Sequence, residues 1–114
     1  MSEMRSPEFQ TSSFAYFLKA LEEPLFLPGL VRASPGFMSE EIPEDWFYES
    51  LARHVSGDWG ELDPENLEAN DAAIKTGARI MSVYRYRGKK VWVITDAGDS
   101  KNRDGTMFLL PEEY

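Results

Sequence analysis

Apolar residues recur every three or four positions in three stretches of the chain, and this spacing predicts three helices. The stretches cover residues 9–23, 42–55 and 64–76. Asp63 precedes Pro64 as an N-cap residue precedes the first turn of a helix. Gly57 and Gly77 follow the second and third stretches, where glycine can adopt the left-handed conformation of a helix C-terminus.

Alternating apolar and polar residues near the C-terminus predict strands over residues 79–87, 90–95 and 106–110. Gly88 and Lys89 indicate a tight hairpin turn between the first two of these strands. The continuous run from Val91 to Ile94 is typical of a central strand that is covered on both faces.

Two shorter extended pieces, residues 25–28 and 30–33, flank Pro28 and Gly29, and the proline favours an edge strand or an irregular segment. The run Ser34-Pro35-Gly36 predicts a turn.

The helices precede the C-terminal strands, which favours an α+β fold over α/β. We expect a three-stranded antiparallel C-terminal sheet packed with two main helices, plus an added N-terminal helix. Residues 1–24 would form the tail and this helix, and residues 25–114 a single compact domain, as the length of 114 residues allows. The predicted core consists of Phe47, Leu51, Leu67, Ile74, Ile80, Trp92, Ile94, Phe108 and Leu110.

The chain is acidic, with 20 Asp and Glu against 12 Lys and Arg and a formal net charge of −8. This charge repels phosphate backbones, so nucleic-acid binding is disfavoured and a basic partner is favoured. The lack of cysteine excludes disulfides, thiolate metal sites and cysteine nucleophiles. No apolar run approaches the ~18 residues of a membrane span, and the N-terminus does not read as a signal peptide. We expect a soluble cytoplasmic protein without a cofactor.

The single histidine, His54, lies four residues before Asp58 and five before Trp59, in a segment that contains two glycines. The two polar residues could form an acid–base pair in which the carboxylate orients the imidazole. We favour a structural interpretation. In it, charged His54 caps the helix C-terminus, Asp58 binds backbone amides of the next turn, and Trp59 is an aromatic plug. No residue is therefore assigned to catalysis.

Asn70 lies on the apolar stripe of the third helix, three residues after Leu67 and four before Ile74, and should face inward. Its amide could brace the backbone of residues 56–60 or bind a substrate, and we favour the first. The candidate binding residues are Asp58, Trp59, Glu61 and Asn70.

A metal site has little support, because zinc sites of the usual kind need more histidine or cysteine. Asn102, Asp104 and Gly105 match positions of a calcium-binding loop, but Ser100 and Pro111 replace its first and last ligands. We therefore predict a polar loop and no metal.

Two charged surfaces could bind partners. Positive charge gathers around the predicted hairpin, and aromatic residues between the cations could stack nucleic-acid bases. The cations are Arg79, Arg85, Arg87, Lys89 and Lys90, and the aromatics are Tyr84 and Tyr86. The acidic surface consists of Glu61, Asp63, Glu65, Glu68 and Asp71, and it could imitate phosphates toward a basic protein or simply be a solvated face.

Several segments stand in a familiar order. They are residues 25–29, 54–63, 70, 79–84, 91–95 and 109–114. The run Gly-Asp-Trp-Gly, the following Asn70 and the closing Leu-Pro-Glu-Glu-Tyr are the most specific. Together they resemble a family of small bacterial plasmid-related proteins, some labelled type I restriction endonuclease subunit M, although this chain is too short for a methyltransferase. The loop at residues 95–105 is longer than the turn usual in that family.

The resemblance carries no catalytic residues, since no biochemistry is established for the family. Together with the acidic charge, it implies a non-enzymatic accessory protein of mobile genetic elements that binds a protein, such as a host defence or restriction component. The alternatives are a small enzyme or ligand-binding domain centred on His54, Asp58, Trp59 and Asn70, and a nucleic-acid binder that uses the hairpin at residues 79–90.

Overall fold

The computed structural model describes residues 13–114, so residues 1–12, including the start of the first predicted helix, lie outside it. The helices are α2 (Ser13–Ala20), α3 (Pro35–Ser39), α4 (Glu44–Val55), α5 (Pro64–Thr76) and the short 3-10 helix η1 (Pro111–Glu113). The strands are β1 (Leu30–Ala33), β2 (Ile80–Tyr86), β3 (Lys89–Thr95) and β4 (Gly105–Leu109). The α+β class is confirmed.

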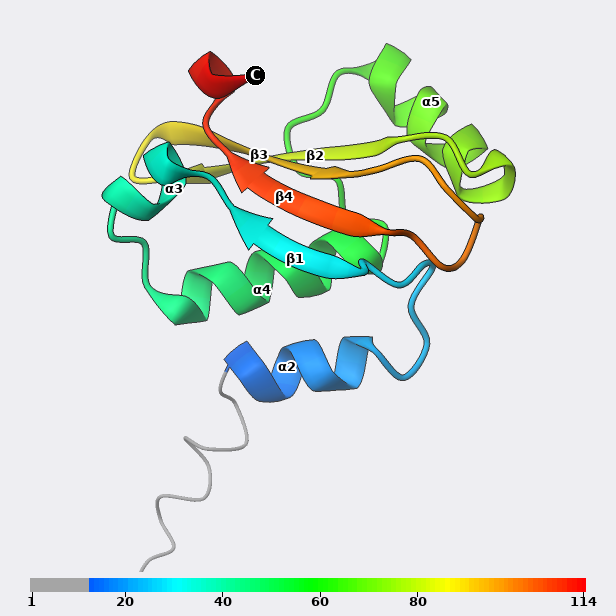
Figure 1. Cartoon of the computed structure of the whole chain (residues 1–114), viewed down its shortest axis with the longest axis horizontal. Coiled ribbons are helices and arrows are strands. Elements are labelled where there is room, and N and C mark those ends of the chain that lie inside the picture. Colours follow the sequence, from blue (N-terminus) through cyan, green and yellow to red (C-terminus); the bar gives the residue numbers. More distant parts are fainter. Residues whose placement is uncertain (1–12) are drawn as a thin grey trace, which may run out of the picture.

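The strands form one mixed sheet in the order β1-β4-β3-β2 (Figure 1). β2 and β3 are an antiparallel hairpin, and β4 continues antiparallel to β3. β1 lies parallel to β4, with Leu30 opposite Gly105 and Ala33 opposite Phe108. The three C-terminal strands are antiparallel as predicted, but the sheet is not three-stranded, because residues 30–33 add a fourth, parallel strand at the edge. That pairing joins segments far apart in sequence, so no local pattern reveals it.

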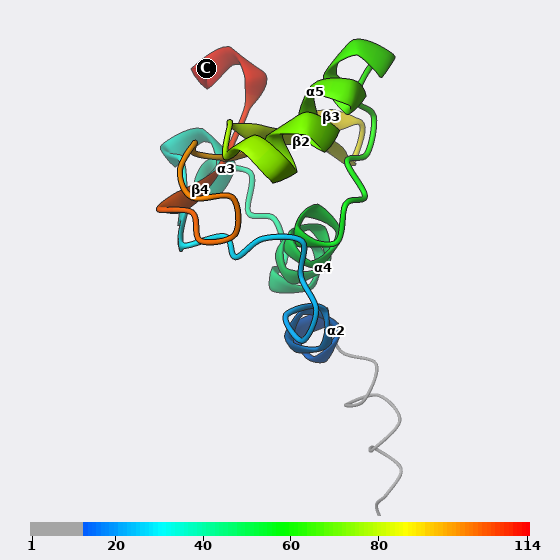
Figure 2. The ribbon, with the colours of Figure 1, turned by 90° about the vertical axis from the view of Figure 1, so that its right-hand side faces the viewer.

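α4 covers one face of the sheet, and α2 lies outside α4 (Figures 1 and 2). Phe14 and Phe17 of α2 pack on Tyr48 of α4, with ring centroids 5.0 and 5.7 Å apart. α5 and η1 lie on the opposite side of the sheet, α5 beside β2 and η1 at the far end (Figure 1). None of the helices within residues 13–114 is long and apolar enough to cross a membrane.

Buried side chains form two clusters under α4 and along the sheet. One is built around Phe26, Val55, Trp59, Ile80 and Val83, and the other around Phe37, Leu51, Tyr84, Val93 and Phe108. Leu67, predicted in the core, is 37% exposed. The reason is that α5 buries only Asn70 and Ala73 completely, so its contact with the sheet is narrower than the apolar stripe suggests.

Local signals set both ends of α5 as predicted. The Asp63 carboxylate accepts a hydrogen bond from the Asn66 amide at 2.8 Å, and Gly77 ends the helix in the left-handed region with φ of 87°. The predicted turn at Ser34 is instead the start of α3, where the Ser34 hydroxyl accepts a hydrogen bond from the Phe37 amide.

Candidate functional site

The segment after α4 runs along the outer edge of β2. The Val83 amide donates to the Trp59 carbonyl at 3.0 Å, and the Glu61 amide donates to the Val83 carbonyl at 2.8 Å. Gly60 has φ of 73°, and a Cβ atom there would lie 2.0 Å from the Val83 carbonyl oxygen. Only glycine fits this contact, and the Gly-Asp-Trp-Gly run therefore closes this edge of the sheet with backbone hydrogen bonds.

Trp59 is buried beneath this segment. Its indole stacks on Phe26 with centroids 6.4 Å apart and meets the His54 ring edge-on at 6.0 Å. The side chain predicted as an aromatic plug is thus in the interior, and its neighbours Asp58 and Gly60 are exposed.

His54 is completely buried, and both of its ring nitrogens bind partners other than Asp58. Its Nδ1 lies 2.6 Å from the Ser82 hydroxyl, and its Nε2 lies 2.8 Å from the Thr95 hydroxyl. The chain of contacts continues from Thr95 to the Thr106 hydroxyl at 2.7 Å, which donates to the Pro28 carbonyl at 2.8 Å.

The donor and acceptor roles in this series of hydrogen bonds determine the His54 tautomer. A carbonyl can only accept, so the single Thr106 proton goes to Pro28. Thr95 must then donate to Thr106 and accept from His54, which places the imidazole proton on Nε2. Nδ1 accepts from Ser82. All hydrogen-bonding atoms of the ring are satisfied by neutral groups.

Burial lowers the pKa of His54 to about 3. The charged helix cap predicted for this residue is therefore wrong, because the ring turns inward between α4 and the sheet, where an imidazolium would be desolvated. A neutral ring enclosed by hydroxyl groups also has no access to solvent or substrate.

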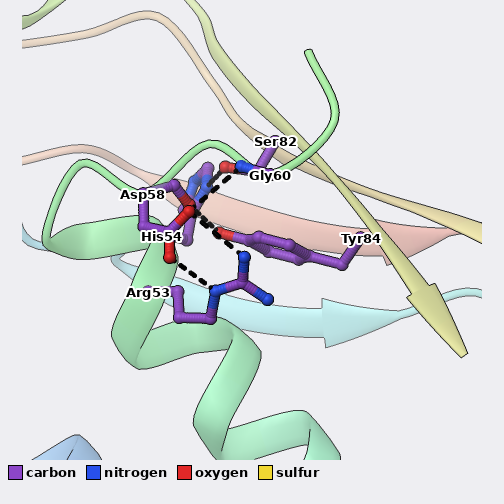
Figure 3. A network of polar contacts seen from close by, with 6 residues as sticks. All are labelled: Arg53, His54, Asp58, Gly60, Ser82 and Tyr84. Carbon is purple, nitrogen blue, oxygen red and sulfur yellow. Dashed lines mark hydrogen bonds and ion pairs between the residues drawn. The ribbon is translucent and has the colours of Figure 1, made fainter.

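Asp58 is held on the surface by Arg53 (Figure 3). The guanidinium donates to both carboxylate oxygens at 2.8 and 3.2 Å, and it lies 4.4 Å from the Tyr84 ring centroid. The Gly60 amide also donates to Asp58, and the Tyr84 hydroxyl donates to the Asp58 carbonyl at 2.6 Å. The Arg53 hydrogen bond lowers the pKa of Asp58, which keeps it ionised. The structure thus separates His54 from Asp58.

Asn70 faces inward, but its partner differs from the predicted one. Its side-chain amide donates to the Met81 carbonyl at 2.7 Å, and its side-chain oxygen accepts from the Met81 amide at 3.2 Å. Asn70 therefore fastens α5 to β2 rather than bracing residues 56–60. Both ends of its amide bind the Met81 backbone, and the side chain is buried, so it is not open to a substrate.

Two residues that hold backbone segments together were not predicted from the sequence. Arg103 is buried and donates to four carbonyls, those of Ala73, Ala78, Asp96 and Ser100. Glu113 accepts from the Ser34 hydroxyl and from the amides of Gly36 and Leu110. The only signal for Glu113 was its place in the closing Leu-Pro-Glu-Glu-Tyr run, and Arg103 had none, because its acceptors are backbone atoms.

Within residues 13–114, no group of three or more His, Cys, Asp or Glu side chains is placed to hold a metal ion.

Both charged surfaces contain paired and unpaired charges. Arg85 of the hairpin binds Glu61 at 2.9 Å, and Lys89 binds Glu40 at 2.8 Å. Arg87 lies over the Tyr86 ring. Lys90 on the hairpin and Glu65, Glu68 and Asp71 on α5 are exposed and form no ion pair with the described residues.

The chain matches none of the protein-family models, curated proteins or solved structures with which it was compared. Its resemblance to plasmid-related proteins therefore stays a prediction.

Proposed function

We propose that this protein acts without catalysis, by binding a basic protein through the acidic surface of α5. Glu65, Glu68 and Asp71 follow one another at intervals of three residues, so they lie close together along the helix. The helix is docked from its other side through Asn70 and Ala73. This exposed row of carboxylates on a firmly held helix is the observation that carries the proposal.

The expected biological setting is that of an accessory protein of bacterial mobile elements, with a host defence or restriction component as the partner. Proteins that handle nucleic acid carry basic surfaces, and a row of carboxylates can occupy such a surface in place of phosphates. The net charge of −8 favours the encounter with a basic protein and disfavours binding to nucleic acid itself.

Both alternatives have less support. An enzyme or ligand-binding site around His54, Asp58, Trp59 and Asn70 would need their side chains to converge, but three of the four are buried. A nucleic-acid site on the hairpin is opposed by the net charge of −8, and two of its five cations, Arg85 and Lys89, are paired with glutamates.

The proposal can be tested by charge reversal with a matched control. The variant Glu68→Lys/Asp71→Lys reverses two of the three charges of the acidic row. The control Glu22→Lys/Glu23→Lys makes the same change in net charge at exposed positions after α2. Tagged proteins are used to capture partners from bacterial lysate at low and high salt, and thermal unfolding confirms that both variants are folded.

We expect a partner that is retained by the wild type and the control, lost with the α5 variant, and released by salt. Screening shortens the reach of surface charges to about 8 Å at physiological ionic strength, so the complex should weaken further above it. Equal recovery of the same partners by the α5 variant would contradict the proposal.

A further inference from the structure

Strand β1 leaves half of its backbone hydrogen-bonding groups unused. The Leu30 amide donates to the Asp104 carbonyl at 3.0 Å, and the Ser34 amide donates to the Phe108 carbonyl at 2.9 Å. Groups that point to one side alternate along a strand, so Val31 and Ala33 turn their amides and carbonyls away from β4. No hydrogen bond between the described residues reaches these outward groups. The β1 edge is therefore open, unlike the β2 edge.

An apolar groove of about 240 Å³ runs beside this open edge. Its apolar walls are Val31 and Ala33 of β1, Phe37 and Met38 of α3, Ile42 before α4 and Phe47 in its first turn. Met38 is 64% exposed. The groove is smaller than the roughly 300–1,000 Å³ of small-molecule pockets, and its shape beside a strand suits the side chains of an added strand.

The geometry of strand addition determines what the groove would bind. A strand hydrogen-bonded to Val31 and Ala33 presents every second side chain on the same face as theirs. Those side chains would enter the groove and should be apolar, while the alternate ones would lie on the other face of the sheet and can be polar.

Charge distinguishes between possible occupants. Glu44 lines the groove, and its exposed neighbours in the chain, Glu41 and Asp45, form no ion pair within residues 13–114. Arg32 is the one cation among the lining residues, and it also lines a depression with Asp96 and Asp104. Glu44 with its chain neighbours Glu41 and Asp45 outnumbers Arg32, and this excess of negative charge favours lysine or arginine in the added strand. A second copy of this acidic chain would bring like charge instead.

We propose that the open edge of β1 binds an extended segment of a partner protein, with alternating apolar side chains flanked by lysine or arginine. The proposal concerns a surface separate from α5 and does not depend on the function proposed for that helix.

The experiment is a selection of phage-displayed random octapeptides on the immobilised full chain. Affinities of the enriched peptides are measured by fluorescence anisotropy, and their binding positions by amide chemical shifts. Ala33→Pro removes one outward amide, which an edge strand tolerates. Met38→Glu places a charge in the groove at an exposed position, so the proposal stays testable if Ala33→Pro does not fold. Leu18→Glu, at a position that is 50% exposed on α2, is the matched control.

We expect enriched peptides with alternating apolar residues and flanking cations. Loss of a backbone hydrogen bond should weaken their binding to Ala33→Pro by about tenfold, while binding to Leu18→Glu stays unchanged. N-methylation of every second peptide amide should abolish binding when the methylated amides are those that face β1. Methylation of the other set should leave binding intact. The proposal is overturned if no peptide is enriched, if the enriched peptides bind Ala33→Pro and Met38→Glu as the wild type, or if the shifts lie away from β1. The proposal would also be overturned if the wild type were a dimer that Ala33→Pro dissociates, because the edge would then bind a second copy of this chain.

Discussion

The buried histidine should make this protein lose stability when the pH falls only slightly below neutrality. In the unfolded chain His54 titrates with an ordinary pKa of about 6.5. In the folded protein burial holds this pKa near about 3. Because the folded pKa is the lower one, the unfolded state binds more protons at every pH between the two values. Stability is therefore complete above the unfolded pKa and declines as the pH falls toward the folded one.

The magnitude follows from the unfolded pKa alone, as long as the folded protein keeps His54 neutral. Between about pH 7.5 and about pH 5.0, protonation of the unfolded state should cost about 2 kcal/mol of unfolding free energy. Hydrogen bonds lower the pKa of Asp58 and Glu113, which also favours the folded state at neutral pH. Those carboxylates titrate mainly below about pH 5, so they contribute little in this window.

The assay is urea unfolding at several pH values, followed by the fluorescence of tryptophan, since Trp59 is buried. His54 is the only histidine in the chain, so His54→Gln removes the whole effect and serves as the control. We expect the variant to be less stable at neutral pH, because the amide does not fill the space of the buried ring, but to have a flat pH dependence across the window. The buried neutral ring would be refuted if the wild type lost less than about 0.5 kcal/mol of unfolding free energy across the window. It would also be refuted if the unfolding free energy of His54→Gln showed the same pH dependence as that of the wild type.

Two further predictions concern backbone contacts. Gly60→Ala would force a Cβ atom against the Val83 carbonyl and should destabilise the fold by about 3 kcal/mol. Gly88→Ala is the control, because it has a similar positive φ with no atom within 4 Å and should cost only about 1 kcal/mol in denaturant unfolding. Arg103→Lys keeps the charge but loses the fork that reaches four carbonyls, and should cost about 2–4 kcal/mol. Arg87→Lys, at an exposed position, should cost less than about 0.5 kcal/mol, and equal losses for the two would argue against the anchoring role of Arg103.

Features that depend on neighbouring residues could be predicted from the sequence. Asp63 caps α5 and Gly77 ends it because both act on the nearest turn of backbone. The hairpin of β2 and β3 followed for the same reason, since a short turn fixes its pairing. The α+β class then followed from the order of these elements.

Features that depend on distant contacts could not be predicted. β1 pairs with a strand more than seventy residues later, and His54 finds its partners at Ser82 and Thr95. The periodicity of α4 placed His54 near a helix end but could not tell whether the ring faces solvent or the sheet. Asn70 was correctly expected to face inward, yet its partner was missed, because proximity in sequence to residues 56–60 did not amount to proximity in space.

The unequal edges of the sheet limit the stoichiometry of any complex that forms by strand addition. The β2 edge is already covered by Trp59, Gly60 and Glu61, while the β1 edge is open. A sheet with two open edges can propagate into fibres, since each added chain offers a new edge. If β1 binds a strand as proposed, the protein has no second open edge of its own, so such complexes should be one-to-one.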